Sequence, residues 1–196
     1  MFHHVSPGTQ LVENSIGKEL KVSRTPIRNA MKKLEDEGLV KIHSNRGAFV
    51  VEPTFQEIRY AFDMRRHLER RTIELIYDQM TEDDLLHLDE WIQHERQTYG
   101  TRNILEYLDV NKQFHMTLAL KANNPFLLDF TERMLDQINV YLMLYGVFIE
   151  ENLNEKQRFY EHELFLEAFR NKDLPHLLQL LDQHMEESLR HMALDE

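Results

Sequence analysis

Apolar side chains recur at helical spacing from residue 54 to residue 193, and this pattern limits the possible folds more than any other feature of the chain. The 196 residues include only 6 Gly and 5 Pro, whereas all-β proteins need many tight turns. Thr54 with Glu57, and Thr81 with Asp84, have the spacing of capping boxes at helix starts. We therefore predict a mainly α protein whose larger part is an all-α bundle. Six helices are expected, at about 54–79, 81–98, 103–122, 125–149, 155–171 and 173–193.

The first 50 residues differ from the rest in charge. They hold eight Lys and Arg against five Asp and Glu, a net charge of +3, whereas the remainder has a net charge of −14. Such asymmetry predicts two domains with different partners, which we place at residues 1–52 and 53–196, joined at Glu52-Pro53. A basic domain can face phosphate groups, while the acidic domain should avoid them.

Composition excludes several classes of protein. The chain has no cysteine, which rules out a disulfide scaffold, a thiolate zinc finger, an iron–sulfur cluster and a cysteine nucleophile. No apolar run is long enough to span a membrane, and no basic and apolar leader opens the sequence. We therefore expect a cytoplasmic protein without a membrane partner.

Residues 1–52 have the layout of a winged helix-turn-helix. A short helix is predicted at residues 12–20, and a second begins after Ser23, a suitable N-cap, and stops at Gly38. Residues 40–43 and 48–51, separated by a polar turn, indicate a β-hairpin. In this motif the start of the second helix enters the major groove of DNA, and the hairpin reaches the minor groove or the backbone.

The candidate DNA contacts lie at the start of the second helix and at the hairpin tip. Arginine suits a guanine edge or a phosphate, and Ser and Thr hydroxyls suit phosphates. The predicted contacts are Ser23, Arg24, Thr25, Arg28, Arg46 and Gly47.

Several polar side chains fall on the apolar faces of the predicted bundle helices: Arg65, Asn111, His115, His162 and His184. A buried polar group without a partner costs on the order of 1–3 kcal/mol. A shared metal ion would remove that cost, and imidazole suits zinc, nickel, copper or iron. Periodicity alone does not establish that the three helices bring their histidines to one point.

Three blocks of the N-terminal part, residues 22–28, 34–40 and 45–50, resemble the DNA-binding domain of GntR-family transcription regulators. The resemblance implies operator contacts by Arg24, Thr25, Arg28 and Gly47. Family members usually carry a further helix before the Pro7-Gly8 step, and only six residues precede it here. Without that helix we expect part of the small core to be exposed. Three explanations for its absence stay open: a late recorded start, trimming of the chain, or a copy compromised for DNA binding.

Residues 54–193 resemble the FCD domain of the FadR subfamily, in its shorter VanR-like form with six helices. The resemblance implies a divalent metal site at Asn111, His115, His162 and His184, and an effector carboxylate held by Arg65. The family usually has Asp where Asn111 stands, so we expect weaker metal binding or an anionic effector that completes the site.

These features predict a metabolite-responsive transcription regulator. It would act as a homodimer on operator DNA, and a small organic acid would bind at a metal, with zinc favoured over nickel or another ion. One alternative is a metal-dependent enzyme, but the chain lacks an HExxH motif and a base carboxylate on the same helix faces, so we expect no enzyme. Another is a metabolite sensor that has lost DNA binding.

Overall fold

The first two helices of the bundle begin at the capping boxes predicted from the sequence. The computed structural model of the chain describes residues 5–100, 103–145, 155–190 and 192. Thr54 and Glu57 exchange hydrogen bonds of 2.8 and 3.2 Å ahead of α3 (Phe55–Ile76). Thr81 and Asp84 do the same ahead of α4 (Glu82–Gly100). Both predicted capping boxes are therefore confirmed.

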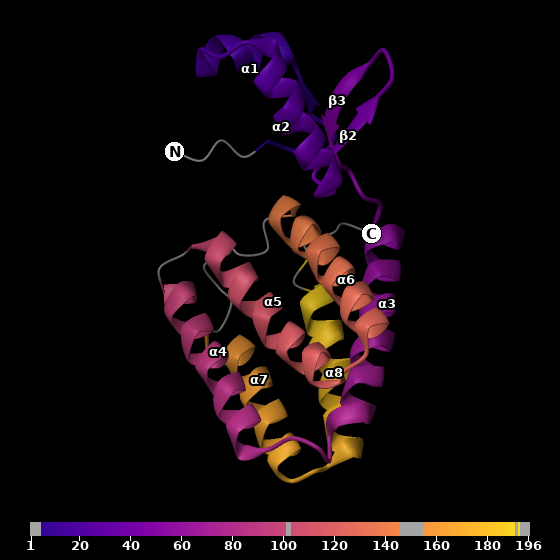
Figure 1. Ribbon diagram of the computed structural model, residues 1–196, viewed down its shortest axis with the longest axis vertical. Coiled ribbons are helices and arrows are strands. Elements are labelled where there is room, and N and C mark those ends of the chain that lie inside the picture. Colours follow the sequence, from indigo (N-terminus) through magenta and orange to yellow (C-terminus); the bar gives the residue numbers. More distant parts are fainter. Residues whose placement is uncertain (1–4, 101–102, 146–154, 191, 193–196) are drawn as a thin grey trace. The chain divides into compact units, whose positions relative to one another are not determined.

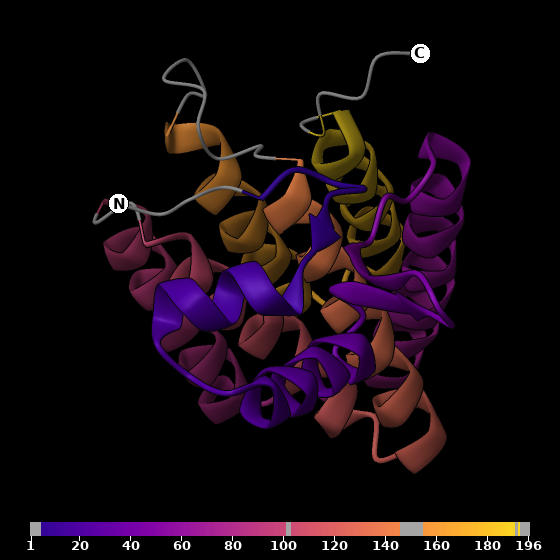
Figure 2. The same ribbon diagram turned by 90° about the horizontal axis from the view of Figure 1, so that it is seen from above.

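The chain divides into two compact units, Met1–Ile58 and Arg59–Glu196. In the first unit, α1 (Glu13–Leu20) and α2 (Arg24–Asp36) form a helical pair with the hairpin of β2 (Val40–His43) and β3 (Gly47–Val50) beside α2 (Figures 1 and 2). The sheet has the order β1-β3-β2, both pairs antiparallel. The strand β1 (Gln10–Leu11) was not expected from the sequence.

The core of the first unit joins α2 to the hairpin. Its buried side chains are Ile27, Met31, Val40 and Ala48. Gly38 ends α2 as predicted, because its φ of +75° is costly for other residues, and the Leu39 N–H returns 2.9 Å to the Leu34 carbonyl. The α1 helix has no buried residue, and three apolar side chains in and around it are 44 to 63% exposed: Val12, Leu20 and Val22.

The second unit is the predicted helical bundle (Figure 1). After α3 and α4 come α5 (Ile104–Lys121), α6 (Pro125–Leu144), α7 (Glu155–Arg170) and α8 (Leu174–Arg190). The α4 helix packs on α5 and α7, α5 packs on α6, and α7 packs on α8. This packing turns the apolar helix faces inward. The polar side chains predicted on those faces can therefore meet inside the bundle.

All six bundle helices were predicted at nearly these positions. The helix expected at 125–149 ends at Leu144 in the structure, while its residues 146–149, like residues 191 and 193 of the last predicted helix, lie outside the described residues. Within the described part of the chain, no helix is both long and apolar enough to cross a lipid bilayer.

Candidate metal, effector and DNA-binding sites

The first unit exposes its basic side chains at the start of α2. Arg24 is the first residue of this helix, and Thr25 and Arg28 follow it, all three exposed. Ser23 stands at the N-cap position, but its side chain makes no capping hydrogen bond, contrary to the expected cap. The Arg28 guanidinium lies 3.0 Å from the Glu13 carboxylate of α1. Part of its charge is therefore balanced within the chain.

The hairpin tip is held by β1. The side-chain amide of Gln10 donates to the Arg46 carbonyl at 2.7 Å. Gly47, with a φ of +93°, turns the chain there, and an added Cβ would meet that amide at 3.4 Å. The Arg46 side chain is exposed, and its guanidinium lies 5.7 Å from the centre of the Phe49 ring. All six predicted DNA contacts are therefore accessible to solvent, and the tip is fixed by a short strand.

The bundle brings three histidines from three helices together. The ring centres of His115 on α5, His162 on α7 and His184 on α8 lie 5.1 to 5.3 Å apart. They are between 1 and 6% exposed, and their ligand nitrogens lie within 4.8 Å of one another. The Nε2 atoms of His162 and His184 are buried without a hydrogen-bond partner. Within the described chain these two nitrogens have no hydrogen-bond partner, and each can offer a lone pair to an ion.

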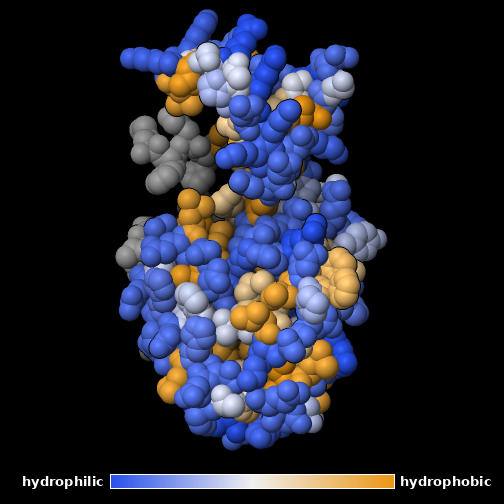
Figure 3. Space-filling model, in the orientation of Figure 1, coloured by the Kyte–Doolittle hydropathy of each residue, from blue (hydrophilic) through white to orange (hydrophobic). Residues whose placement is uncertain are grey.

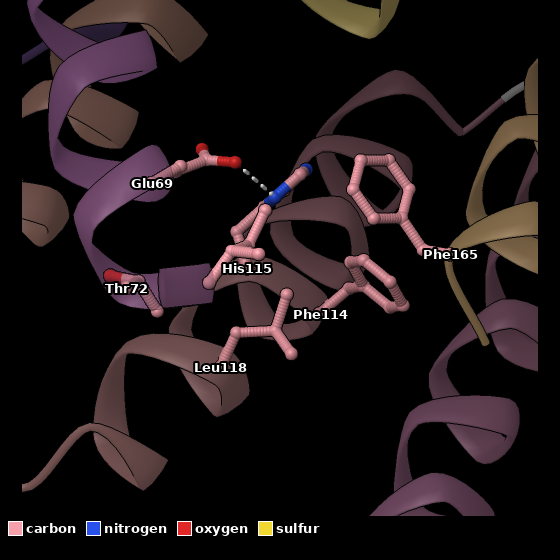
Figure 4. Close-up of a pocket in the computed structure, with 7 residues that line it drawn as sticks. Glu69, Thr72, Phe114, His115, Leu118 and Phe165 are labelled. Carbon is pink, nitrogen blue, oxygen red and sulfur yellow. Dashed lines mark ion pairs between the residues drawn. The ribbon is translucent and has the colours of Figure 1, made fainter. Parts of the chain in front are cut away.

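A carboxylate stands behind each of the three rings, on its Nδ1 side. Glu69 Oε2 lies 3.0 Å from Nδ1 of His115, Glu95 Oε2 lies 2.8 Å from Nδ1 of His162, and Glu161 Oε2 lies 2.7 Å from Nδ1 of His184. Figure 4 shows the first of these contacts. A carboxylate on Nδ1 favours the tautomer that carries its proton there and leaves Nε2 free to bind a metal.

Arg65 of α3 completes this arrangement. It is 3% exposed, as its inward position on the helix predicted. Its Nε donates to Glu69 at 2.6 Å, and one terminal nitrogen lies 2.8 Å from Nε2 of His115. Because a guanidinium only donates, His115 must accept at Nε2 and carry its proton on Nδ1, which faces Glu69.

The surroundings keep His115 and His184 neutral. Burial, aided by the charge of Arg65, lowers the pKa of His115 to about 3. Burial also lowers the pKa of His184. The pKa of Glu69 falls because Arg65 and His115 outweigh the cost of burying its charge. Neutral imidazoles with free Nε2 atoms are the form that binds metal ions.

Asn111 lies one turn before His115, and its amide faces Glu95 rather than solvent. The Asn111 Nδ2 donates to Glu95 Oε1 at 3.0 Å. Glu95, on α4, is 2% exposed and also contacts His162. The site residues predicted from the sequence did not include Glu95, Glu69 or Glu161. Glu69 lies four residues after Arg65 on one helix face and Glu161 directly precedes His162, two signals that could have found them, but Glu95 gave none.

The low pKa of His115 predicts an acid-sensitive bundle. Below about pH 6.5 the unfolded chain takes up a proton at this residue that the folded chain excludes, so acid favours unfolding. The free energy of unfolding should fall by up to about 1.4 kcal/mol per pH unit toward pH 5, and His184 adds to the same trend. Glu69 adds to the acid sensitivity only at lower pH. Its carboxylate stabilises the folded chain above the pKa that Glu69 has in the unfolded chain, and this stabilisation is lost as the pH falls below that value.

Urea unfolding with a metal chelator present, followed by the fluorescence of Trp91, measures this slope. Trp91 is the single tryptophan of the chain and lies in α4, where its indole N–H contacts Thr117 of α5. A His115→Gln variant should have a shallower slope between about pH 7 and pH 5. Equal slopes in the two proteins would show that His115 titrates normally.

Comparison with known proteins identifies both units. The FCD domain profile matches residues 60–187, and the profile described as bacterial regulatory proteins of the gntR family matches residues 3–50. The chain belongs to the GntR family of transcription regulators with an FCD domain. Proteins of this family bind operator DNA, usually as dimers, and FCD domains commonly bind metals.

Individual GntR-family proteins align along most of the chain. An uncharacterised HTH-type transcriptional regulator of Bacillus subtilis, YdhC, is 26% identical over 92% of this chain and 86% of its own length. The gluconate operon transcriptional repressor of Bacillus licheniformis is 25% identical over 93% of this chain and 76% of its own length. The solved structure of Escherichia coli McbR/YncC has the same fold, with a TM-score of 0.72 at 21% identity, over 95% of this chain and 87% of that one.

This GntR-family chain is therefore a DNA-binding transcription regulator that responds to a metabolite through its FCD domain. The alternative of a metal-dependent enzyme is set aside, because the families that match this chain and its relatives are transcription regulators and not enzymes.

Proposed function

We propose that this regulator holds one divalent transition metal, zinc or alternatively nickel, in its FCD domain. The ligands would be the Nε2 atoms of His115, His162 and His184 and the amide oxygen of Asn111. The observation that carries this proposal is the pair of buried Nε2 atoms, of His162 and His184, that have no partner. An ion among them would satisfy both and would act as a Lewis acid for an effector oxygen.

Arg65 is the proposed effector contact. One lone pair of His115 cannot both accept from Arg65 and bind a metal, so in the metal-bound form Arg65 must release Nε2 of His115. Its Nε would stay on Glu69, and the released N–H would face a carboxylate of the effector. The cavity beside His115 has room for about one water molecule. A small organic acid would therefore fit this cavity only if the side chains that line it moved.

Operator recognition is assigned to residues 1–52, and effector binding and dimerisation to residues 53–196. Two copies would place Ser23, Arg24, Thr25 and Arg28, with Arg46 and Gly47 of the hairpin, on two half-sites of a palindrome. The acid would change operator affinity by binding two arrangements of the dimer unequally.

Exposed apolar pairs on the bundle offer surface for the second copy. Much of the face in Figure 3 is hydrophilic, with apolar patches among the bundle helices. Tyr60 and Met64 on α3, and Phe126 and Phe130 on α6, are each spaced by four residues on one helix face and are between 53 and 75% exposed.

Metal analysis of the purified protein tests the site. We expect about one zinc or nickel ion per chain, lost in a His162→Ala/His184→Ala variant. His176→Ala is the matched control, because His176 is exposed on the same helix as His184. A thermal-shift screen of small carboxylic acids follows, with and without the ion. Stabilisation should require the ion and should disappear in Arg65→Met, whose folding and metal content are measured first.

Two results would contradict the proposal. If the wild-type protein binds neither zinc nor nickel, the histidines have another role. If Arg65→Met keeps the full response to an acid that stabilises the wild-type protein, Arg65 is not the effector contact.

A further inference from the structure

Glu95 is a buried carboxylate with an unusual set of partners. It is 2% exposed and contacts Asn111 of α5 and His162 of α7, both neutral when they bind a metal. Among the described residues no Lys or Arg forms an ion pair with it. A buried carboxylate with no fixed cation beside it is costly, so its position calls for a functional reason.

The contacts of Glu95 fix which atoms of its partners face the histidine cluster. A carboxylate only accepts hydrogen bonds, so the side of the Asn111 amide that faces Glu95, at 3.0 Å, must be the NH₂ group. The Asn111 oxygen is then turned away from Glu95. The contact of 2.8 Å with Nδ1 of His162 likewise keeps the proton on Nδ1 and leaves Nε2 unprotonated.

Charge supplies the second argument. Three imidazoles and one amide form a neutral ligand set, so the ligands themselves leave the charge of a divalent cation unbalanced. The Glu69 charge is already matched by Arg65 at 2.6 Å. Glu161 is 22% exposed on its side chain, so solvent screens it. Glu95 therefore holds the most deeply buried negative charge that remains to balance a divalent cation.

We propose that Glu95 is a positioning residue of the metal site, which orients Asn111 and His162 and supplies the negative charge that the ligands themselves lack. This inference rests on the proposed metal site. The family usually has an aspartate where Asn111 stands on α5. Here Glu95 on α4 would supply that negative charge without itself binding the metal.

The test is to move the carboxylate from position 95 to position 111. Four proteins are compared: wild type, Glu95→Gln, Asn111→Asp and the double variant Glu95→Gln/Asn111→Asp. Zinc and nickel dissociation constants are measured by competition with a coloured chelator. Glu90→Gln is the matched control, since Glu90 is exposed on the same helix.

Glu95→Gln should weaken metal binding about 10- to 100-fold, the usual effect of losing a partner behind a ligand, while Glu90→Gln should bind as wild type does. The double variant should recover most of the affinity, because the aspartate introduced on α5 restores the charge and the glutamine introduced on α4 can donate to it. Asn111→Asp alone brings two carboxylates into contact, so its metal-free form should unfold at a lower temperature than the double variant.

A second readout is independent of metal. Nitrogen-15 spectra of the metal-free wild type should show His162 with its proton on Nδ1, and Glu95→Gln should populate the other tautomer. A purely structural role for Glu95 would lower the melting temperature of all Glu95 variants equally, without recovery in the double variant.

The outcomes separate this inference from the metal site itself. If Glu95→Gln binds metal within twofold of wild type, the site stands and the role of Glu95 is refuted. If the double variant binds no more tightly than Glu95→Gln, the charge argument is refuted. If wild type binds neither ion, both the site and the role of Glu95 in it are refuted. Should Glu95→Gln fail to fold, the double variant must still bind metal about as tightly as wild type.

Discussion

A Glu69→Ala variant is expected to lose about 3–5 kcal/mol of the free energy of unfolding of the bundle. Glu69 is 6% exposed and holds the Nε of Arg65 at 2.6 Å. Its removal leaves the Arg65 guanidinium, itself 3% exposed, without a carboxylate in a medium of low polarity. Removing one partner of a buried ion pair costs more than the pair contributes, because the other charge stays behind.

Urea unfolding followed by Trp91 fluorescence measures this loss. The matched comparison is Arg65→Met/Glu69→Leu, which removes both charges and should be far more stable than Glu69→Ala. Glu74, half-buried on the same helix, pairs within the described chain only with the exposed Arg71. Glu74→Ala should therefore change the free energy of unfolding by less than about 1 kcal/mol. A loss below that value in Glu69→Ala would show that Arg65 finds another partner or reaches water.

An Arg24→Ala/Arg28→Ala variant is expected to lose operator binding by a factor of about a hundred or more. Each arginine that reads a base edge contributes about 1–3 kcal/mol to discrimination. Both side chains are exposed at the start of α2. The contribution of Arg28 should fall at the lower end of that range, because it must leave Glu13, 3.0 Å away, to contact DNA.

Binding is measured on a duplex selected from a random library with the wild-type protein, at two salt concentrations. Lys32→Ala/Lys33→Ala removes the same charge from the exposed later part of α2 and should weaken all duplexes to a similar, smaller extent. A duplex with one half-site should bind more weakly than the full palindrome if two copies act together. A wild-type chain that selects no duplex would instead be a metabolite sensor without DNA binding.

The helices could be predicted because their signals are local. The capping boxes at Thr54 and Thr81, and the αL stop at Gly38, involve residues within a few positions of each other. The apolar stripes placed Arg65 and the three histidines inward for the same reason. The strand β1 escaped prediction, since two residues contain no alternating pattern and its pairing with β3 spans 39 residues, from Gln10 to Phe49.

The arrangement around the histidines depends on contacts between distant helices. Glu95 meets His162 across 67 residues of sequence, and Arg65 meets His115 across 50. Periodicity gives the face on which each side chain lies but not its partner, so the direction of the Asn111 amide could not be foreseen. The family resemblance supplied the ligand candidates, and the contacts of the described residues add the carboxylates behind them.

The burial of the three imidazoles has a kinetic consequence. With 1 to 6% exposure, no ring of the proposed metal ligands stands open to water, so a bound ion would exchange only when the helices part. Such openings take microseconds to seconds or longer and become rarer as the bundle becomes more stable. Exchange should therefore lag behind changes in the free metal concentration. The bound ion would act as a lasting component of the regulator, and the quickly varying signal would be the acid.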